Sequence, residues 1–382
     1  MIGRIVEVAD DRRHLFMHRG FMVVQDTEGE RKELGQVPLD DIAAVIANAH
    51  GLSYTNNLLV ALAERGAPFV LCAANHNAVG MLLPIEGNFE QAKRIEMQIA
   101  ASQPTHKRLW ATVVRSKLEQ QGAALEATGT PSAPLTALAS KVKSGDPENL
   151  EAQGARRYWQ LLFGTEFRRD QNGGGINGLL NYGYTVLRAT TARAVIAAGL
   201  HPSIGLHHSN DSNAMRLVDD LMEPFRPMID LKVWQLHRNG EKEVSPQTKR
   251  ALVRTLYDDM QTEAGATPVM VCVQKLCTSL AQVYLGEREK LELPLPGLPL
   301  ALAAALGVLA VGSLSPSLAL AQSAPSVRGL PDFADLVMHV FRQPNGLRLI
   351  RNRALDALSD PPGGVGREPA QAHLHVLPEQ TA

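Results

Sequence analysis

The hydrophobic pattern of this chain changes its period near residue 90, and this change constrains the fold more than any other feature. Before it, short apolar runs alternate with turn residues, as at 42–46 and 69–72, which predicts buried strands. One segment, 56–65, has helical spacing and ends before a glycine. We therefore predict a small β-rich N-terminal domain over residues 1–88 that contains one helix.

After residue 90 the apolar residues recur at helical spacing. This pattern predicts amphipathic or buried helices at 91–101, 107–125, 149–163, 179–198, 213–221, 246–264 and 271–285. The sequence therefore predicts an α+β fold class, in which a larger all-α domain over residues 89–292 follows the β-rich domain.

The last part of the sequence differs in kind, because residues 293–327 include no charged side chain. The apolar run 298–311 is short of the ~20 residues that span a bilayer, and prolines interrupt its surroundings. Residues after 361 have the composition of a disordered tail. We predict that 293–382 is a C-terminal extension, first hydrophobic and then of low order, with no membrane insertion. A membrane-anchored protein is the alternative, and fractionation of the full chain against one ending at Glu292 would test it.

Charge and cysteine content bear on partners and compartment. The formal net charge is −1, so any basic surface for nucleic acid has to be local. The three cysteines, Cys72, Cys272 and Cys277, have neither disulfide-framework nor zinc-site spacing, which fits a reducing cytosol. Acidic residues follow the first methionine closely, unlike a secretory signal. We predict a cytoplasmic protein.

Two carboxylates and one imidazole are the candidate metal ligands. Glu151 lies in the first turn of a predicted helix, where the helix dipole favours a carboxylate. His208 lies in a polar loop just before another predicted helix. Glu223 shares a face of that largely apolar helix with Asp220, and a carboxylate there needs a cation or a basic partner such as Arg226. Oxygen ligands with one imidazole suit Mg²⁺ or Mn²⁺.

Each of these residues also has a simpler interpretation. Glu151 can decorate a helix start, His208 can be a hydrogen-bonded structural residue, and the acids near Glu223 can form a solvated face. The HExxH zinc motif is absent from the sequence, and so is a P-loop.

A set of basic, aromatic and amide residues around these positions forms the candidate DNA surface. Asparagine and tyrosine crowd residues 177–188 at a predicted helix start, where free N–H groups can receive phosphate, although an ordinary capped helix explains the composition equally well. Basic side chains hold phosphates without reading sequence and make binding salt-dependent. The candidates are Arg156, Arg157, Tyr158, Asn181, Tyr184, Arg188, Arg193 and Arg226.

Four motifs in order, at 151–159, 180–184, 201–208 and 220–227, resemble the CRISPR adaptation integrase family, most closely its type II branch. The resemblance covers residues 1–292 and implies a β-rich N-terminal domain before an α-helical catalytic domain. It implies that Glu151, His208 and Glu223 are the catalytic metal ligands and that Asp220 is a supporting acid. The family usually has Gly-Phe-Leu-His where this chain has Gly205-Leu206-His207-His208, which leaves open an exchange of roles between His207 and His208.

The resemblance also implies an activity and partners. The activity is CRISPR spacer acquisition by a metal-dependent DNA endonuclease and integrase, in which a protospacer 3′-hydroxyl attacks a phosphodiester of the CRISPR array. The implied partners are double-stranded DNA of protospacer and array, a small second adaptation protein, a second copy of the chain in a homodimer, and, as a further candidate, the RNA-guided effector nuclease. The alternatives are a metal-dependent nuclease of branched DNA that does not integrate, and an inactive DNA-binding assembly scaffold.

Overall fold

The computed structural model describes residues 3–28 and 31–297 of the 382-residue chain. The predictions made for residues 298–382 lie outside the described residues. Within the described ranges, none of the helices has the length and apolar character needed to cross a membrane.

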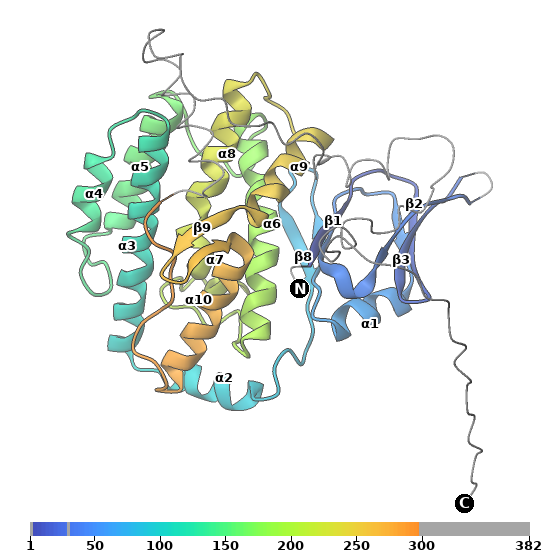
Figure 1. Cartoon of the computed structure of the whole chain (residues 1–382), viewed down its shortest axis with the longest axis horizontal. Coiled ribbons are helices and arrows are strands. Elements are labelled where there is room, and N and C mark those ends of the chain that lie inside the picture. Colours follow the sequence, from blue (N-terminus) through green and yellow to red (C-terminus); the bar gives the residue numbers. More distant parts are fainter. Residues whose placement is uncertain (1–2, 29–30, 298–382) are drawn as a thin grey trace, which may run out of the picture. The chain divides into compact units, whose positions relative to one another are not determined.

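The N-terminal part contains two four-stranded sheets (Figure 1). The first has the order β1-β5-β7-β8, in which the first three strands are parallel and the fourth is antiparallel to its neighbour; they are β1 (Arg4–Val8), β5 (Ile42–Ala47), β7 (Phe69–Cys72) and β8 (Ala78–Leu82). The second has the order β4-β3-β2-β6, formed by β2 (Arg13–His18), β3 (Phe21–Asp26), β4 (Glu33–Pro38) and β6 (Leu52–Tyr54).

Strand β5 is buried on both faces, which explains its continuous apolar run. Alternate residues of a strand point to opposite faces. Val45 and Ala47 belong to the core that also includes residues of α1 (Asn56–Glu64). Ala44 and Ile46 pack with Ala189 of α6 (Ile176–Ala197). The first sheet therefore lies directly on the helical part of the protein.

In the helical part, α6 packs against β5 of the first sheet and has most of its residues buried (Figure 1). The other helices of this part are α2 (Gln91–Ala100), α3 (Gln103–Ala127), α4 (Ala133–Ala139), α5 (Leu150–Phe163), α7 (Arg216–Met222), α8 (Arg226–Arg238), α9 (Pro246–Arg254) and α10 (Val269–Tyr284), and the last four of them pack against α6. Three short 3₁₀ turns are η1 (Leu39–Asp41), η2 (Glu223–Phe225) and η3 (Thr255–Tyr257). The predicted fold class, α+β with strands first and a larger helical part after them, is confirmed.

Glycines mark the closest helix crossings. A Cβ on Gly183 of α6 would lie 2.4 Å from Ile229 of α8, and a Cβ on Gly154 of α5 would lie 2.2 Å from Leu118 of α3. Both distances are too short for real atoms, so with a Cβ at either position the facing side chain or the helix would have to shift. The crossing at Gly154 brings α5 and α3 together beside the candidate ligand Glu151.

The helical part departs from the all-α prediction at one hairpin. The predicted helix 246–264 ends at Arg254, and β9 (Asp259–Thr262) pairs antiparallel with β10 (Gly265–Pro268). Met260 and Thr262 are buried and Gln261 is exposed, so this segment has the period of a strand and the helical prediction was wrong there. Strands β4, β6 and β8 and helices α4 and α8 were also not predicted from the sequence.

The helical path is interrupted at Glu223. Helix α7 ends at Met222, η2 follows, and α8 begins at Arg226. Pro224 and Pro227 each lie in the first turn of a new element, where the missing N–H costs nothing. This succession of short elements puts Glu223 at a helix junction.

The first residues of the predicted extension lie on the helical part. Gln120 of α3 donates through Nε2 to the carbonyl of Leu295 (3.0 Å), and the Leu295 N–H donates to the carbonyl of Gln261 (2.9 Å).

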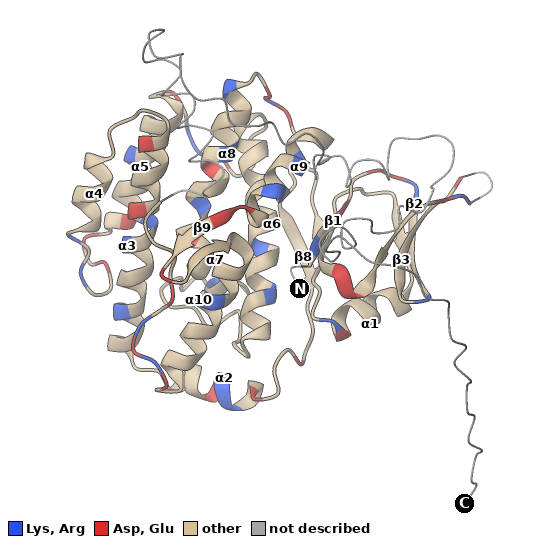
Figure 2. Cartoon of the chain, viewed as in Figure 1, with Lys and Arg blue, Asp and Glu red and all other residues tan. Residues whose placement is uncertain are grey.

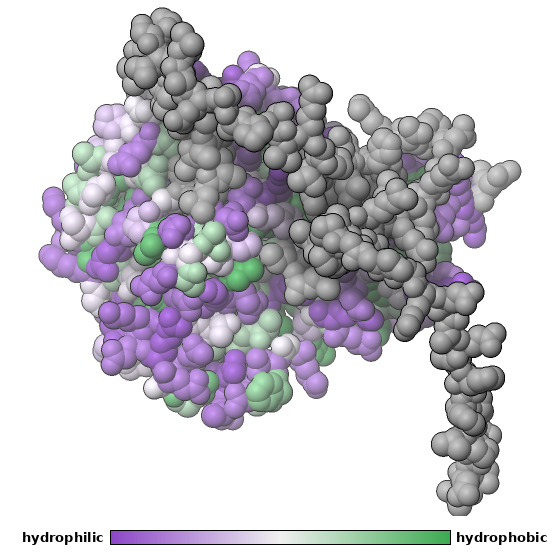
Figure 3. All heavy atoms as spheres, in the orientation of Figure 1, coloured by the Kyte–Doolittle hydropathy of each residue, from purple (hydrophilic) through white to green (hydrophobic). Residues whose placement is uncertain are grey.

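Acidic and basic residues are interspersed over the helices (Figure 2), and hydrophilic residues cover most of the helical face drawn in Figure 3. The formal net charge is small because 38 lysine and arginine residues nearly balance 39 aspartate and glutamate residues.

Candidate active site

Glu151 is held at the start of α5 by a capping carboxylate that the sequence analysis did not identify. Asp146 accepts hydrogen bonds from the backbone N–H groups of Leu150 (2.8 Å) and Glu151 (2.9 Å). Asn149 precedes the helix with a left-handed backbone, φ +51°. These bonds satisfy donors that a helix start leaves free, and they fix where the Glu151 side chain begins.

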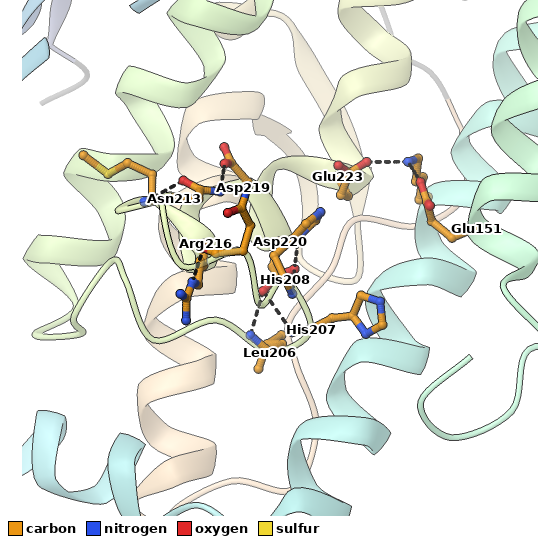
Figure 4. Close-up of polar contacts among 12 residues, drawn as sticks. Glu151, Leu206, His207, His208, Asn213, Arg216, Asp219, Asp220 and Glu223 are labelled. Atoms are coloured by element: carbon orange, nitrogen blue, oxygen red, sulfur yellow. Dashed lines mark hydrogen bonds and ion pairs between the residues drawn. The ribbon is translucent and has the colours of Figure 1, made fainter. Parts of the chain in front are cut away.

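Lys117 of α3 joins the two predicted carboxylate ligands. Its Nζ donates to Glu151 Oε1 and lies 2.5 Å from Glu223 Oε2, an ion pair drawn as a dashed line at Glu223 in Figure 4. Its side chain is only 7% exposed. Burial by itself disfavours the ammonium, but the carboxylates of Glu223 and Glu151 outweigh burial and raise the pKa of Lys117. Lys117 is therefore a buried cation shared by two carboxylates.

Glu223 is the most buried of the three predicted ligands, with 5% of its side chain exposed. Arg226 Nη2 lies 3.2 Å from Glu223 Oε1. Burial would raise the pKa of Glu223, but Arg226 and Lys117 together lower it, so the carboxylate is ionised. Within the described residues, Oε2 is close to the ammonium of Lys117 but has no partner in hydrogen-bonding geometry. A buried acceptor in this state has capacity for a ligand.

His208 is positioned by Asp220, which is fully buried on α7. Asp220 Oδ1 lies 2.6 Å from His208 Nδ1, and the two carboxylate oxygens also accept the backbone N–H groups of Leu206, His207 and His208 (Figure 4). The imidazole therefore carries a proton on Nδ1, and its Nε2 is the atom left for a metal. The hydrogen bond to Asp220 raises the pKa of His208. Asp220 thus orients the histidine through its ring and its backbone.

The ring of His207 turns away from this cluster. It stacks on Trp110 of α3, with ring centroids 4.5 Å apart and planes 1° from parallel. Gly205 allows the loop to approach α7, because a Cβ there would lie 2.8 Å from Asp220 Oδ2. The structure therefore favours His208 over His207 as the residue of the candidate site.

The chemistry of Glu151, Glu223 and His208 Nε2 fits Mg²⁺ or Mn²⁺, and the buried Glu223 Oε2 is an acceptor without a hydrogen bond. Their arrangement is incomplete: among residues 3–28 and 31–297, no three His, Cys, Asp or Glu side chains are grouped so that they could hold a metal. The reason is visible in the contacts. Both carboxylates turn to Lys117, and His208 is engaged with Asp220 on its other nitrogen.

The family of the chain follows from comparison with known proteins. The sequence profile of the family described as CRISPR associated protein Cas1 matches residues 7–251. The chain belongs to the Cas1 family. A relative from Neisseria meningitidis serogroup C (strain 8013), named CRISPR-associated endonuclease Cas1, is 38% identical over 264 residues, which is 68% of this chain and 86% of the relative.

Solved structures share the Cas1 fold at low identity. A casposase bound to an integration product has a TM-score of 0.66 and 20% identity, and the match covers 76% of this chain and 92% of that one. A chain of a Cas6-RT-Cas1–Cas2 complex has a TM-score of 0.61 and 16% identity, over 77% of this chain and 36% of that one. At these identities the likeness concerns the fold.

Among the residues predicted to bind DNA, two are buried in this Cas1-family chain and a third is partly buried. Tyr158 and Asn181 are buried, and Asn181 bonds to Arg169 (2.7 Å) and to the backbone of Gln171 (2.8 Å). The ring of Tyr184 lies under the guanidinium groups of Arg169 and Arg226, and its hydroxyl donates to Asp230. Internal hydrogen bonds hold Asn181 and Tyr184, and packing holds Tyr158, so direct DNA contact by these side chains stays a prediction.

The arginines divide by exposure. Arg156 and Arg157 are exposed on α5. Arg188 pairs with Asp219 through two hydrogen bonds of 2.7 and 2.9 Å. Arg193 is partly buried, and its Nη1 lies 3.5 Å from the carbonyl of Ile42. The first two are therefore the most available for DNA.

Lys117 was the main omission of the sequence analysis. The sequence did contain a signal for Lys117, because this lysine lies among apolar residues of α3, such as Leu118, that are buried. A lysine in that setting needs anionic partners, which are not adjacent in sequence.

Proposed function

We propose that this chain is the integrase of CRISPR spacer acquisition, which joins the 3′-hydroxyl of a short foreign DNA duplex to a phosphodiester of the CRISPR array. One observation carries the proposal: Glu151 and Glu223 converge on one buried cation, beside a histidine aligned by Asp220, in a chain of the Cas1 family. The endonuclease name of the Neisseria relative and the integration product in the casposase structure support cleavage or joining of DNA.

The proposed reaction uses Mg²⁺ or Mn²⁺ held by Glu151, Glu223 and His208 Nε2. Such an ion supplies activation of the attacking hydroxyl and stabilisation of charge on the phosphoryl and leaving oxygens. The chain's own residues prepare the site. Asp220 keeps the proton on His208 Nδ1, and Arg226 holds Glu223 Oε1 so that Oε2 points inward.

DNA phosphates are proposed to lie along α5. Arg156 and Arg157 are exposed on the helix that begins with Glu151, so a backbone held there lies near the carboxylate cluster. Such contacts position the duplex and weaken with salt. Arg188, Arg193 and Arg226 stay candidates, although Arg188 and Arg226 already pair with carboxylates.

An apolar surface on and after β8 supports assembly with protein partners. Val79 and Leu82 of β8, and Ile85 and Phe89 beyond it, are exposed, Phe89 to 94%. Exposed apolar groups of this kind mark interaction surfaces, and β8 is the last strand of its sheet. We propose a homodimer through this surface, and a small second adaptation protein as partner, since a solved relative is a complex named with Cas2. The RNA-guided effector nuclease stays a predicted partner.

A joining assay tests the proposal. The chain and the second adaptation protein of the same CRISPR system are mixed with a 3′-hydroxyl duplex, a supercoiled plasmid carrying leader and repeat, and Mg²⁺. We expect a joined product that disappears with 3′-dideoxy ends or with a chelator. Glu223→Gln should lower joining by about 10²–10³-fold, the usual loss when one group that stabilises the transition state is removed.

The alternatives give different products in the same assay. Plasmid cleavage without joined product would favour a nuclease of branched DNA. Unchanged joining by the Glu223→Gln protein would contradict the proposed site and favour a scaffold role for this chain.

A further inference from the structure

The contacts of Lys117 carry an inference that rests on the proposed metal-dependent function. We infer that the Lys117 ammonium stands in for the divalent cation between Glu151 and Glu223 and has to leave when Mg²⁺ or Mn²⁺ binds. Lys117 is then a positioning residue that holds the two carboxylates together before metal loading.

The ammonium of Lys117 already occupies the space between the two carboxylates. Glu151 Oε1 and Glu223 Oε2 contact the same Nζ atom, which lies 2.5 Å from the second oxygen. Mg²⁺ binds oxygen at about 2.0–2.1 Å, so an ion bridging these oxygens would overlap the ammonium. The two cations therefore cannot occupy the space at once.

The net charge of the carboxylate cluster opposes the binding of a divalent ion beside Lys117. Glu151 and Glu223 contribute two negative charges, and Lys117 and Arg226 contribute two positive ones, so this largely buried cluster is neutral. A divalent ion added beside both cations would leave two uncompensated positive charges out of water, which is costly. Departure of Lys117 halves that excess, so metal binding and the ammonium oppose each other.

His208, the third candidate ligand, is already positioned for a metal. His208 is already fixed by Asp220, with Nε2 left for a metal, yet the described residues include no complete three-ligand group. The carboxylates are turned to the ammonium instead. Departure of the Lys117 ammonium would free both carboxylates to join His208 in one metal site.

Manganese binding to the intact chain, measured by calorimetry and by the electron paramagnetic resonance signal of free Mn²⁺, tests the inference. Lys117→Met removes the ammonium and keeps an unbranched side chain. Lys249→Met is the matched control, because Lys249 is also a buried lysine paired with a glutamate, Glu7 (2.8 Å). We expect Lys117→Met to lower the Mn²⁺ dissociation constant at least about tenfold, the scale on which residues next to ligands tune metal affinity. Lys249→Met should leave it unchanged.

Other outcomes separate this inference from the proposed function. Equal Mn²⁺ affinity of the unmodified and Lys117→Met proteins, with binding lost in Glu223→Gln, would overturn the role of Lys117 and leave the metal site standing. Absence of Mn²⁺ binding in every protein would reject the metal site and the inference with it.

A measurement on the unmodified chain covers the case in which Lys117→Met does not fold. Amine-reactive labelling followed by mass spectrometry reports the accessibility of each lysine. Lys117 is almost inaccessible in the structure, and we expect its labelling to rise severalfold with Mg²⁺ while that of Lys249 stays constant. Labelling of Lys117 that does not change with Mg²⁺ at saturating concentration would contradict its departure.

Discussion

Two buried lysine–glutamate clusters in this protein look alike and differ in how completely their oxygens are used. At the junction of sheet and helices, Lys249 of α9 lies 2.8 Å from Glu7 Oε1 of β1. Asn48 donates to the same oxygen (2.7 Å) and the Tyr182 hydroxyl donates to Glu7 Oε2 (3.1 Å). Both oxygens of Glu7 therefore have hydrogen bonds, as expected of a cluster that stabilises a fold.

The cluster at Lys117 is built differently. One ammonium serves two carboxylates, and Glu223 Oε2 has no hydrogen bond among the described residues. The two clusters are alike in burial and charge pairing, and they differ in that one ammonium is shared by two carboxylates at Lys117.

The largest expected effect comes from breaking the complete cluster. Glu7→Ala leaves Lys249 buried without its anion, so we expect the free energy of unfolding in urea to fall by about 3–5 kcal/mol. Mn²⁺ affinity of the folded protein should not change, because Glu7 is not near the candidate ligands. A parallel loss of Mn²⁺ affinity in the folded variant would mean that the two clusters are not independent.

A smaller effect is expected from Asp220→Asn, which alters only the support of the histidine. An amide cannot reproduce the carboxylate that accepts from His208 Nδ1, so the ring loses its fixed tautomer. We expect Mn²⁺ affinity to fall about 10–100-fold. Asp219→Asn is the matched control, since Asp219 is the adjacent residue and pairs with Arg188. Equal losses in both variants would indicate general damage to α7.

A separate effect, seen only as a function of pH, concerns Asp230, which accepts the Tyr184 hydroxyl behind Arg226. Burial raises the pKa of Asp230 from 3.8 to about 7. The folded protein therefore holds this proton more tightly than the unfolded chain, and stability falls as pH rises from about 4 to about 7. The slope is at most about 1.4 kcal/mol per pH unit.

Asp230→Asn should remove that part of the pH dependence. Urea unfolding at pH 5, 6, 7 and 8 measures it, and the free energy of unfolding of the unmodified chain should rise from pH 8 to pH 5 relative to that of Asp230→Asn. Identical slopes would show that Asp230 does not titrate in this range.

The sequence predicted the parts of the fold that depend on local pattern. The burial of β5 on both faces follows from its unbroken apolar run, and the interruption of the helix at Glu223 follows from Pro224 and Pro227. Local pattern failed where an element is short or mixed, as in the hairpin after Arg254 and in β8. Such segments are stabilised by their neighbours more than by their own composition.

For the candidate site, sequence supplied the residue types and tertiary structure decided their roles. Glu151, His208 and Glu223 were predicted as metal ligands from their setting, and the family resemblance implied Asp220 as a supporting acid; these roles stay predictions. The separation of His207 from His208 depends on Trp110, which lies on a distant helix. Tyr158 and Asn181 looked available for DNA and proved to be interior.

The amino-acid order alone determined the change from strands to helices and the chemistry of the ligand candidates, because both depend on residues close together in the chain. Only the packed structure decided that Lys117 lies between Glu151 and Glu223. That contact requires α3 to pack against both α5, at Gly154, and the η2 turn that contains Glu223. Distances between helices are fixed by the fit of side chains across their surfaces, which no local pattern records.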